Sequence, residues 1–300
     1  MFFAEKVFRI CLDYNFIEYP PKPDFDTILY RYSENKELVY EMKPSFSTQE
    51  GMFKTNKYGM RDYEYSLTKP FGVIRIAILG DSVSFGKDLM MHQVFDTILE
   101  KQLNDNSKVK YEVLNFSVVG YNAYQEEIVL KEKIFKFNPD IVIVASCLDD
   151  ETYTDGLSEL TRQMSPYSIG SRMHSKLISY LLNGYEKKFF KRLSNTDKIK
   201  NLCKQLSFLG REEQFESLVL IFPYYFDDIN SYPERRQHIR RRKMMEKEGV
   251  KTIDLMESWK DMIPEERKLL YHPDDRSHLS AVGMQKIADM LSEYIRYKKG

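Results

Sequence analysis

The chain has 300 residues, of which 42% are hydrophobic and 30% are charged, the composition of an ordinary globular protein. This length allows one large domain with a small appendage. The 45 Lys and Arg residues balance 45 Asp and Glu residues, so the net charge is zero and excludes nucleic-acid binding by overall charge. Cys11, Cys147 and Cys203 lie far apart, which predicts isolated thiols rather than a disulfide framework or a metal site.

The N-terminal segment shows no targeting signal. Met1–Ala4 is apolar, but Glu5 and Lys6 follow at once. No apolar run reaches the ~7 to 15 residues of a signal-peptide core or the ~20 of a transmembrane helix. We therefore expect a cytoplasmic protein, although a longer chain trimmed behind an anchor would look the same. Within residues 3–11 one helical face is apolar, which favours packing on the protein body over binding to a membrane surface.

Residues 1–70 are predicted to form an extension that packs on the main domain, residues 71–300. The extension contains a rigid break at Tyr19–Pro23, followed by short strand-like runs. From Phe71 onward, apolar runs typical of strands alternate with helical patterns. The predicted strands are Ile74–Leu79, Tyr111–Phe116, Ile141–Val144, Leu218–Phe222 and Val250–Leu255.

The helical patterns between these strands define the fold class. They cover about 94–103, 124–135 and 234–248, the last ended by Gly249, and a closing helix starts after Ser280. Because Ile141–Val144 is apolar at every position, it is predicted to be a central parallel strand. The alternation predicts an α/β fold with a parallel sheet covered on both faces. A helical insertion at about 151–216 is placed to cap a site at the carboxyl ends of the strands.

A serine follows the first predicted strand, in Gly80-Asp81-Ser82. Open α/β sheets place their chemistry at the carboxyl ends of strands, and a serine nucleophile needs a base, usually histidine. In Asp275-Arg276-Ser277-His278, one loop carries both a base and a carboxylate able to orient it. The alternative is that Asp275 and Ser280 cap the helix that follows. The other histidines lack such a pattern: His92, His174, His238 and His272.

Four elements in this order resemble the SGNH/GDSL hydrolase superfamily. They are Gly-Asp-Ser after the first strand, Gly120 after the second, an acidic pair after the third, and D-x-x-H before the last helix. The stretch 55–62 also resembles a segment that precedes the first strand in many bacterial members. The resemblance covers about residues 50–300. It implies a flavodoxin-like three-layer α/β/α fold and hydrolysis of a small ester, thioester or acylated sugar through an acyl-serine, without a metal or cofactor.

The resemblance also implies roles for single residues. Ser82 would be the nucleophile and His278 its base, with Asp275 orienting the ring. The backbone N–H groups of Ser82 and Gly120 would contribute to the oxyanion hole. In the Cys147-Leu148-Asp149-Asp150 segment, Asp149 occupies the position where the family has an asparagine, whereas Asp150 matches the family.

The change at Asp149 alters the predicted oxyanion hole, because an ionised aspartate has no proton to donate. A protonated Asp149, or the amide of Asn122, would replace the missing donor. We therefore predict a serine esterase with an altered oxyanion hole. The alternatives are a catalytically silent binding module and an acyltransferase on the same fold.

Two kinds of charged cluster lie outside this set. The acidic groups lack the spacing of a calcium loop and are predicted to be solvated loops rather than metal sites; they are Asp149, Asp150, Glu151 and Asp155, and the pair Asp227-Asp228. The run Arg235–Lys243 is predicted to lie on a helix. It forms either a solvated face or a docking site for an anionic partner, such as an acyl carrier domain or an acidic glycan.

Overall fold

The computed structural model describes residues 29–35, 37–38, 40–48, 53–148, 198–273 and 275–299. Several predictions fall outside these residues. They are the helical face within 3–11, the insertion up to residue 197, and the side chains of Asp149 and Asp150.

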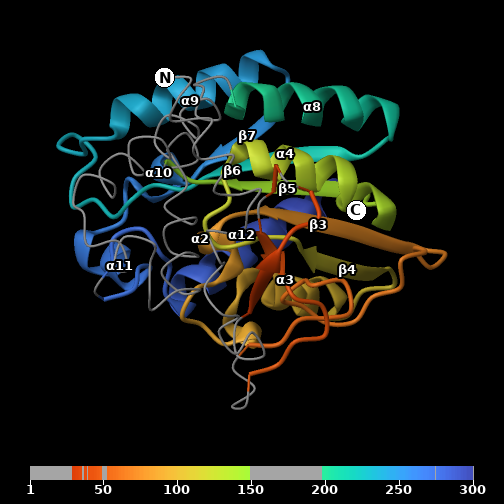
Figure 1. The fold of residues 1–300 in the computed structure, drawn as a ribbon. Coiled ribbons are helices and arrows are strands. Elements are labelled where there is room, and N and C mark those ends of the chain that lie inside the picture. The colour runs from red at the N-terminus through yellow and green to blue at the C-terminus, as the bar shows by residue number, and fades with distance from the viewer. Residues whose placement is uncertain are drawn as a thin grey trace, which may run out of the picture.

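The central sheet has five parallel strands in the order β4-β3-β5-β6-β7 (Figure 1). Their bounds are β3 Val73–Gly80, β4 Lys110–Asn115, β5 Ile141–Ser146, β6 Glu216–Ile221 and β7 Lys251–Asp254. In chain order this is 2-1-3-4-5, the flavodoxin-like arrangement of a doubly wound sheet. The predicted fold class is therefore confirmed. β5 is buried at every residue and pairs with β3 and β6, as expected for a central strand.

Helices cover both faces of the sheet (Figure 1). One face carries α4 (Ala123–Glu132), α8 (Lys198–Glu212) and α9 (Arg235–Lys247), and the other carries α3 (Phe95–Asn104) and α12 (Ala281–Lys299). Each face has its own apolar core. Because side chains alternate along a strand, Leu79 packs into the first core and Ile78 into the second. Among the described helices, none combines the length and hydropathy needed to cross a bilayer.

The described part of residues 29–70 lies against the main sheet. β1 (Tyr30–Tyr32) and β2 (Tyr40–Met42) form a small antiparallel hairpin. The Tyr40 hydroxyl donates to the Val119 carbonyl at 2.7 Å, and its ring contacts that of Tyr121 edge-on at 5.2 Å. The hairpin is thereby anchored to the segment that follows β4.

The predicted strands and helices occur close to their expected positions. The last strand is shorter than predicted because the Asp254 side chain accepts a hydrogen bond from the Met256 N–H and caps α10 (Leu255–Trp259). Gly249 follows α9 with φ +80°, a conformation that favours glycine and ends the helix as predicted. The remaining short helices are α2 (Ser82–Phe85), α11 (Pro264–Leu269), η2 (Met91–Gln93) and η3 (Ile134–Phe137).

Candidate active site

Ser82 is the first residue of α2 and lies just past the carboxyl end of β3. The Asp81 carboxylate accepts a hydrogen bond from the Val83 N–H at 2.9 Å and caps this short helix. A Cβ atom at Gly80 would lie 2.3 Å from the Ser84 hydroxyl oxygen and 3.0 Å from the Ala145 Cβ. Only glycine therefore lets β3 turn into α2 this tightly, and the turn holds the Ser82 hydroxyl at the edge of the sheet.

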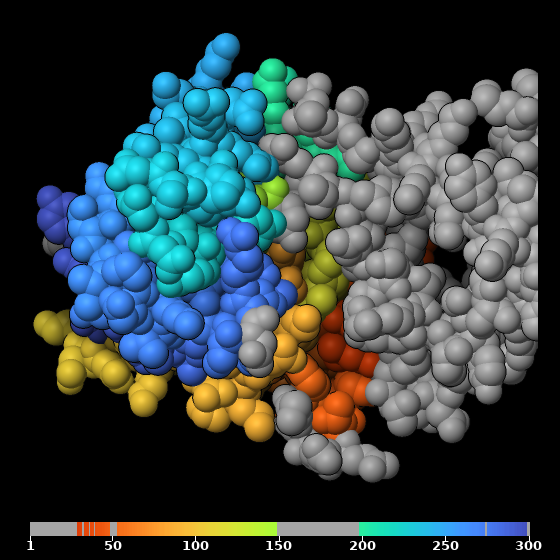
Figure 2. All heavy atoms as spheres, turned by 90° about the vertical axis from the view of Figure 1, so that its left-hand side faces the viewer, coloured from red at the N-terminus to blue at the C-terminus, as the bar shows by residue number. Residues whose placement is uncertain are grey.

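His278 and Asp275 lie beside Ser82. The Ser82 hydroxyl oxygen is 2.8 Å from the His278 Nε2 atom, and the His278 Nδ1 atom is 2.5 Å from the Asp275 Oδ2 atom. The structure thus brings Ser82 into one hydrogen-bonded line with Asp275 and with His278, which lies 196 positions later in the chain. Figure 2 views this edge of the molecule, where the segment after β6 (cyan), the segment before α12 (blue) and the segment after β3 (orange) meet.

The capping alternative holds for Ser280 alone. Its hydroxyl oxygen accepts a hydrogen bond from the Gly283 N–H at 3.2 Å, at the start of α12. Asp275 instead binds within its own loop. Its Oδ1 atom accepts hydrogen bonds from the Ser277 N–H at 2.7 Å, the Ser277 hydroxyl at 2.6 Å and the His278 N–H at 3.2 Å.

These contacts set the charge of Asp275. Its partial burial disfavours the ionised form, but the hydrogen bonds from the Ser277 hydroxyl and the His278 ring outweigh that effect. Together they hold the pKa of the Asp275 carboxyl well below its usual range. The carboxylate is thus charged at neutral pH and fixes which nitrogen of the ring carries the proton.

The loop that carries His278 is fastened to the segment after β6. The Tyr225 N–H donates to the Arg276 carbonyl at 2.7 Å, and the Tyr271 hydroxyl donates to the Pro223 carbonyl at 2.9 Å. Next to Ser82 and His278 lies a cavity of about 30 Å³, room for about two water molecules. Its lining residues are Asp81, Ser82, Val83, Cys147, Phe222, Pro223, Tyr224, Ser277 and His278.

Gly120 lies at the same edge of the sheet, in the turn after β4, with φ +78°. The Val118 N–H donates to the Gly80 carbonyl at 3.1 Å, and the Ser117 and Ser84 hydroxyl groups are 2.8 Å apart. These bonds tie the Gly120 turn to the Ser82 turn, although Gly120 is not among the residues that line the cavity. The Asn122 side-chain oxygen accepts hydrogen bonds from two N–H groups of α4, so the structure uses it as a helix cap.

Arg241 holds the segment that follows β5, which the sequence did not indicate. Its side chain is 3% exposed and donates to the carbonyl of Cys147 and, at 2.9 Å, to that of Leu148. The prediction of a solvated run at Arg235–Lys243 is therefore wrong for Arg241. It is also wrong for His238, which is fully buried with its Nδ1 atom 3.2 Å from the Asp254 carboxylate. Because charged residues lie on every side of this helix, its sequence does not show which face is buried.

The stretch 55–62 stabilises the far end of α2. The Arg61 guanidinium donates to the carbonyls of Phe85 at 2.8 Å and Gly86 at 2.9 Å, and it packs against the rings of Phe53 and Phe85. Asp62 accepts a hydrogen bond from the Asn115 N–H at 2.7 Å at the end of β4. This stretch therefore links the Ser82 turn to the neighbouring strand.

Two buried carboxyl groups lie beneath this link. Burial, followed by the charge of Asp96, raises the pKa of Asp62 well above its usual range. Burial also raises the pKa of Asp96 to about 7, against the hydrogen bond from Asn115 and the charge of Arg61. At neutral pH this region therefore holds a carboxyl proton that the unfolded chain would release.

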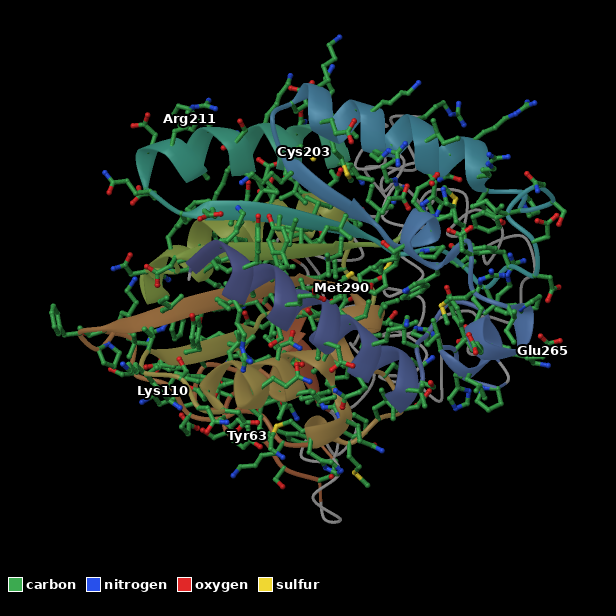
Figure 3. The ribbon with its side chains drawn as sticks, turned by 180° about the vertical axis from the view of Figure 1, so that it is seen from behind. Tyr63, Lys110, Cys203, Arg211, Glu265 and Met290 are labelled. Carbon is green, nitrogen blue, oxygen red and sulfur yellow. The ribbon has the colours of Figure 1, made fainter. Side chains whose placement is uncertain are left out.

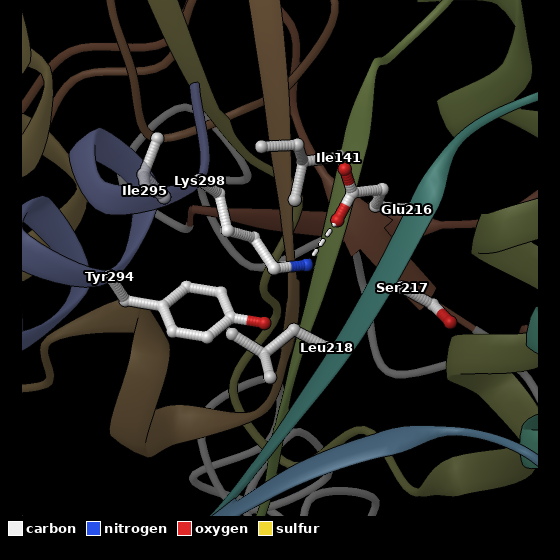
Figure 4. A pocket seen from close by; sticks show the side chains of 7 residues that line it. All are labelled: Ile141, Glu216, Ser217, Leu218, Tyr294, Ile295 and Lys298. Carbon is white, nitrogen blue, oxygen red and sulfur yellow. Dashed lines mark hydrogen bonds and ion pairs between the residues drawn. The ribbon is translucent and has the colours of Figure 1, made fainter. Parts of the chain in front are cut away.

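The described residues place no group of three or more His, Cys, Asp and Glu side chains where they could bind a metal ion. Asp227 accepts a hydrogen bond from the Tyr225 hydroxyl at 2.5 Å, and Asp228 accepts one from the Asn230 N–H at 3.1 Å. At the opposite end of the sheet, the ion pair of Lys298 with Glu216 at 2.6 Å borders a cavity of about 10 Å³ (Figure 4). That cavity is too small for a ligand larger than water.

The fold is similar to that of a solved acetyl xylan esterase, and two further solved structures match less well. An acetyl xylan esterase, AlAXEase, matches with a TM-score of 0.51 and 14% identity, over 74% of this chain and 100% of that chain. TesA matches with a TM-score of 0.47 and 15% identity, over 72% of this chain and 94% of its own. The esterase EstA from Pseudoalteromonas sp. matches with a TM-score of 0.46 and 15% identity, over 75% and 97%. No protein-family model and no curated protein sequence matches the chain. The likeness to AlAXEase shows the α/β/α fold that the SGNH/GDSL resemblance implied.

Proposed function

We propose that the protein is a serine ester hydrolase that works through an acyl-serine intermediate. The observation that carries this proposal is the hydrogen-bonded line from Ser82 through His278 to Asp275. A serine hydroxyl is a weak nucleophile until a base takes its proton, and a ring nitrogen 2.8 Å away is within reach to do so.

The first half of the reaction forms the acyl-serine. Ser82 attacks the carbonyl carbon of the ester while His278 Nε2 accepts the hydroxyl proton. The resulting imidazolium then gives this proton to the departing alkoxide oxygen, which leaves as the alcohol. Asp275 accepts the hydrogen bond from the Nδ1–H group throughout, which keeps Nε2 free as the base and stabilises the charged ring.

The second half releases the acid. A water molecule attacks the acyl carbon, and His278 takes one of its protons. His278 then returns a proton to the Ser82 oxygen as the carbon–oxygen bond breaks, and the carboxylic acid leaves. An acyltransferase would run the same first half and accept an alcohol in place of water in the second.

The oxyanion of each tetrahedral intermediate needs hydrogen-bond donors to stabilise it. The N–H groups of Ser82 and Gly120 are the proposed backbone donors. The third position, Asp149, lacks the asparagine amide, and we propose that Arg241 compensates for its charge. The guanidinium binds the carbonyl of Leu148, the residue directly bonded to Asp149, and is buried, where a charge acts over a longer range than in water.

The cavity beside Ser82 favours a small acyl group. Its volume of about 30 Å³ is bounded by Phe222, Pro223 and the Tyr224 segment, which the His278 loop holds in place. We therefore propose short-chain esters, acetyl esters first, as the substrate class. Hydrolysis of p-nitrophenyl acetate should exceed that of the octanoate ester in kcat/KM.

A fluorophosphonate probe tests the proposal directly, because it labels only a serine that a base has activated. We expect labelling of Ser82, located by mass spectrometry, and its loss in Ser82→Ala. Ser84→Ala serves as the matched control, since Ser84 is a buried serine of the same helix that hydrogen-bonds to Ser117. The absence of labelling in the folded wild type would refute the hydrolase and leave the binding module. Labelling with acyl transfer to added alcohol in preference to water would assign the acyltransferase.

A further inference from the structure

The basic residues of helix α9 lie on two opposite faces, one buried against the sheet and one exposed. Of its 13 residues, five are arginine, two are lysine and one is glutamate. His238, Arg241 and Met245 are buried against the sheet. The opposite side carries four exposed cations at helical spacing, which we call the basic stripe: Arg236, Arg240, Lys243 and Lys247. At 1.5 Å per residue this stripe is about 16 Å long.

Among the described residues, the basic stripe has no acidic partner. Within the described part of the chain, none of its four side chains forms an ion pair. The neighbouring Arg242, by contrast, lies 3.8 Å from the Glu246 carboxylate and 3.9 Å from that of Asp254. Since the whole chain has no net charge, this concentration of positive charge is a local feature of α9 and not a consequence of composition.

Helix α8 extends the surface next to the stripe. α8 and α9 pack against each other on the same face of the sheet (Figure 1). Lys204 and Phe208 lie one turn apart on the outer side of α8, and Phe208 is 52% exposed. Figure 3 shows nitrogen-tipped side chains projecting outward from α9, with Arg211 marking the end of α8. A Cβ atom at Gly249, two residues past α9, would lie 3.2 Å from the Ser207 hydroxyl oxygen, so Phe208 belongs to the part of α8 that lies next to the end of α9.

We propose that this surface, consisting of the basic stripe with Lys204 and Phe208, docks on an anionic lipid bilayer. Each cation gains attraction to acidic headgroups within a Debye length of about 8–10 Å, and the gains add along the stripe. Phe208 has no polar atom, and it leaves water when it enters the boundary between headgroups and acyl chains. A polyanion without apolar groups would satisfy the cations but would leave the ring in water. An anionic bilayer fits both features of this surface, and an acidic protein is an outcome of the test.

The docking surface lies beside the candidate active site and does not cover it. Glu234, directly before α9, is 3.6 Å from Arg276 in the loop of His278. The stripe therefore begins near the rim of the site and runs away from it along the helix. A docked molecule keeps the edge that carries Ser82 open to esters near the membrane surface. The proposal does not depend on the proposed function, because lipid binding is measured without catalysis.

Co-sedimentation with phosphatidylcholine vesicles, with and without phosphatidylglycerol, tests the proposal. We expect the protein to bind only the vesicles that contain phosphatidylglycerol and to be released by high salt. The triple change Arg236→Glu, Arg240→Glu and Lys243→Glu should weaken binding on the order of a hundredfold. Phe208→Ser should weaken it on the order of tenfold.

A matched control carries the same charge change on the other face of the sheet. The exposed control residues are Lys101 on α3, Lys108 before β4 and Lys110 at the start of β4, and their change to Glu should leave binding as in the wild type. Both triple variants should keep the wild-type melting temperature and the same rate on a soluble ester. Three results would overturn the proposal: no binding to anionic vesicles, equal loss in both triple variants, or binding to polyglutamate with none to vesicles. The last would assign the surface to an acidic protein.

Discussion

Changing Asp275 to asparagine tests the proposed role of His278 as the base, because it replaces one carboxylate oxygen by an NH₂ group. From the described residues, the Asp275 Oδ1 atom accepts three hydrogen bonds, two of them from backbone N–H groups, whereas Oδ2 accepts one, from His278 Nδ1. An amide nitrogen in the Oδ1 position could not accept these three hydrogen bonds, because it carries N–H donors itself. The new NH₂ group must therefore take the Oδ2 position and face the ring.

The expected effect follows from this orientation. With an N–H donor opposite Nδ1, the neutral ring carries its proton on Nε2, and the Ser82 oxygen 2.8 Å away then meets a donor and not a base. In serine proteases the same change of tautomer lowers kcat by about 10⁴, which corresponds to about 5.5 kcal/mol. The bonds to Oδ1 remain, so the melting temperature should change by no more than about 3 °C.

The assay is kcat on p-nitrophenyl acetate together with the rate of fluorophosphonate labelling. Ser277→Ala is the matched control, because it removes one hydrogen bond to Asp275 and leaves the tautomer unchanged; its kcat should fall less than about tenfold. A folded Asp275→Asn protein that keeps more than a tenth of the wild-type kcat would refute the reasoning. Asp275 would then stabilise its loop without orienting His278 as a base.

Three further changes test other parts of the reasoning. Asp149→Asn should raise kcat by up to the 10²–10³ that one oxyanion donor supplies, and a fall would give the carboxyl a role of its own. Arg241→Ala removes the guanidinium donor to the buried Cys147 carbonyl and should cost about 1–3 kcal/mol in urea unfolding, with partial recovery in Arg241→Lys. Asp96 holds a proton with a raised pKa of about 7, so the stability it contributes is complete below the unfolded pKa of about 4 and is lost as the pH rises to about 7. The melting temperature of the wild type should therefore fall between pH 5 and pH 8 relative to that of Asp96→Asn, and parallel curves would contradict the assignment.

The features that the sequence could predict are local ones. The buried residues of β3 and β5 are consecutive in the sequence, so each strand can be recognised from one apolar run. Gly80-Asp81-Ser82 marks a turn directly at the end of a strand. Asp275 and His278 lie three residues apart, so their contact needs only one loop. The meeting of that loop with Ser82 could also be expected, because the carboxyl ends of parallel strands share one edge.

The features that the sequence could not predict depend on which way a side chain faces in the folded protein. Arg241 and Arg236 are both arginines on α9, yet the first is buried and the second exposed. An apolar stripe normally marks the inner side of a helix, but the inner side of α9 carries His238 and Arg241. Their partners are Asp254 at the end of β7 and the Leu148 carbonyl just past β5. The burial of Arg61 could not be predicted either, because the carbonyls that accept its hydrogen bonds lie 24 and 25 residues later in the chain.

The position of Arg241 bears on how Asp149 is accommodated. A protonated Asp149 would supply the missing donor, but a nearby positive charge lowers the pKa of a carboxyl group and opposes protonation. Arg241 binds the carbonyl of Leu148, one peptide bond before Asp149, so compensation of an ionised carboxylate is the favoured explanation. In Arg241→Gln the charge of Asp149 would act on the oxyanion without this compensation, so Asp149→Asn would remove a larger penalty there. The gain in kcat should therefore be larger when Asp149→Asn is made in Arg241→Gln than in the wild type. A double-mutant cycle measures this difference, and a gain that is no larger in Arg241→Gln would refute the compensation.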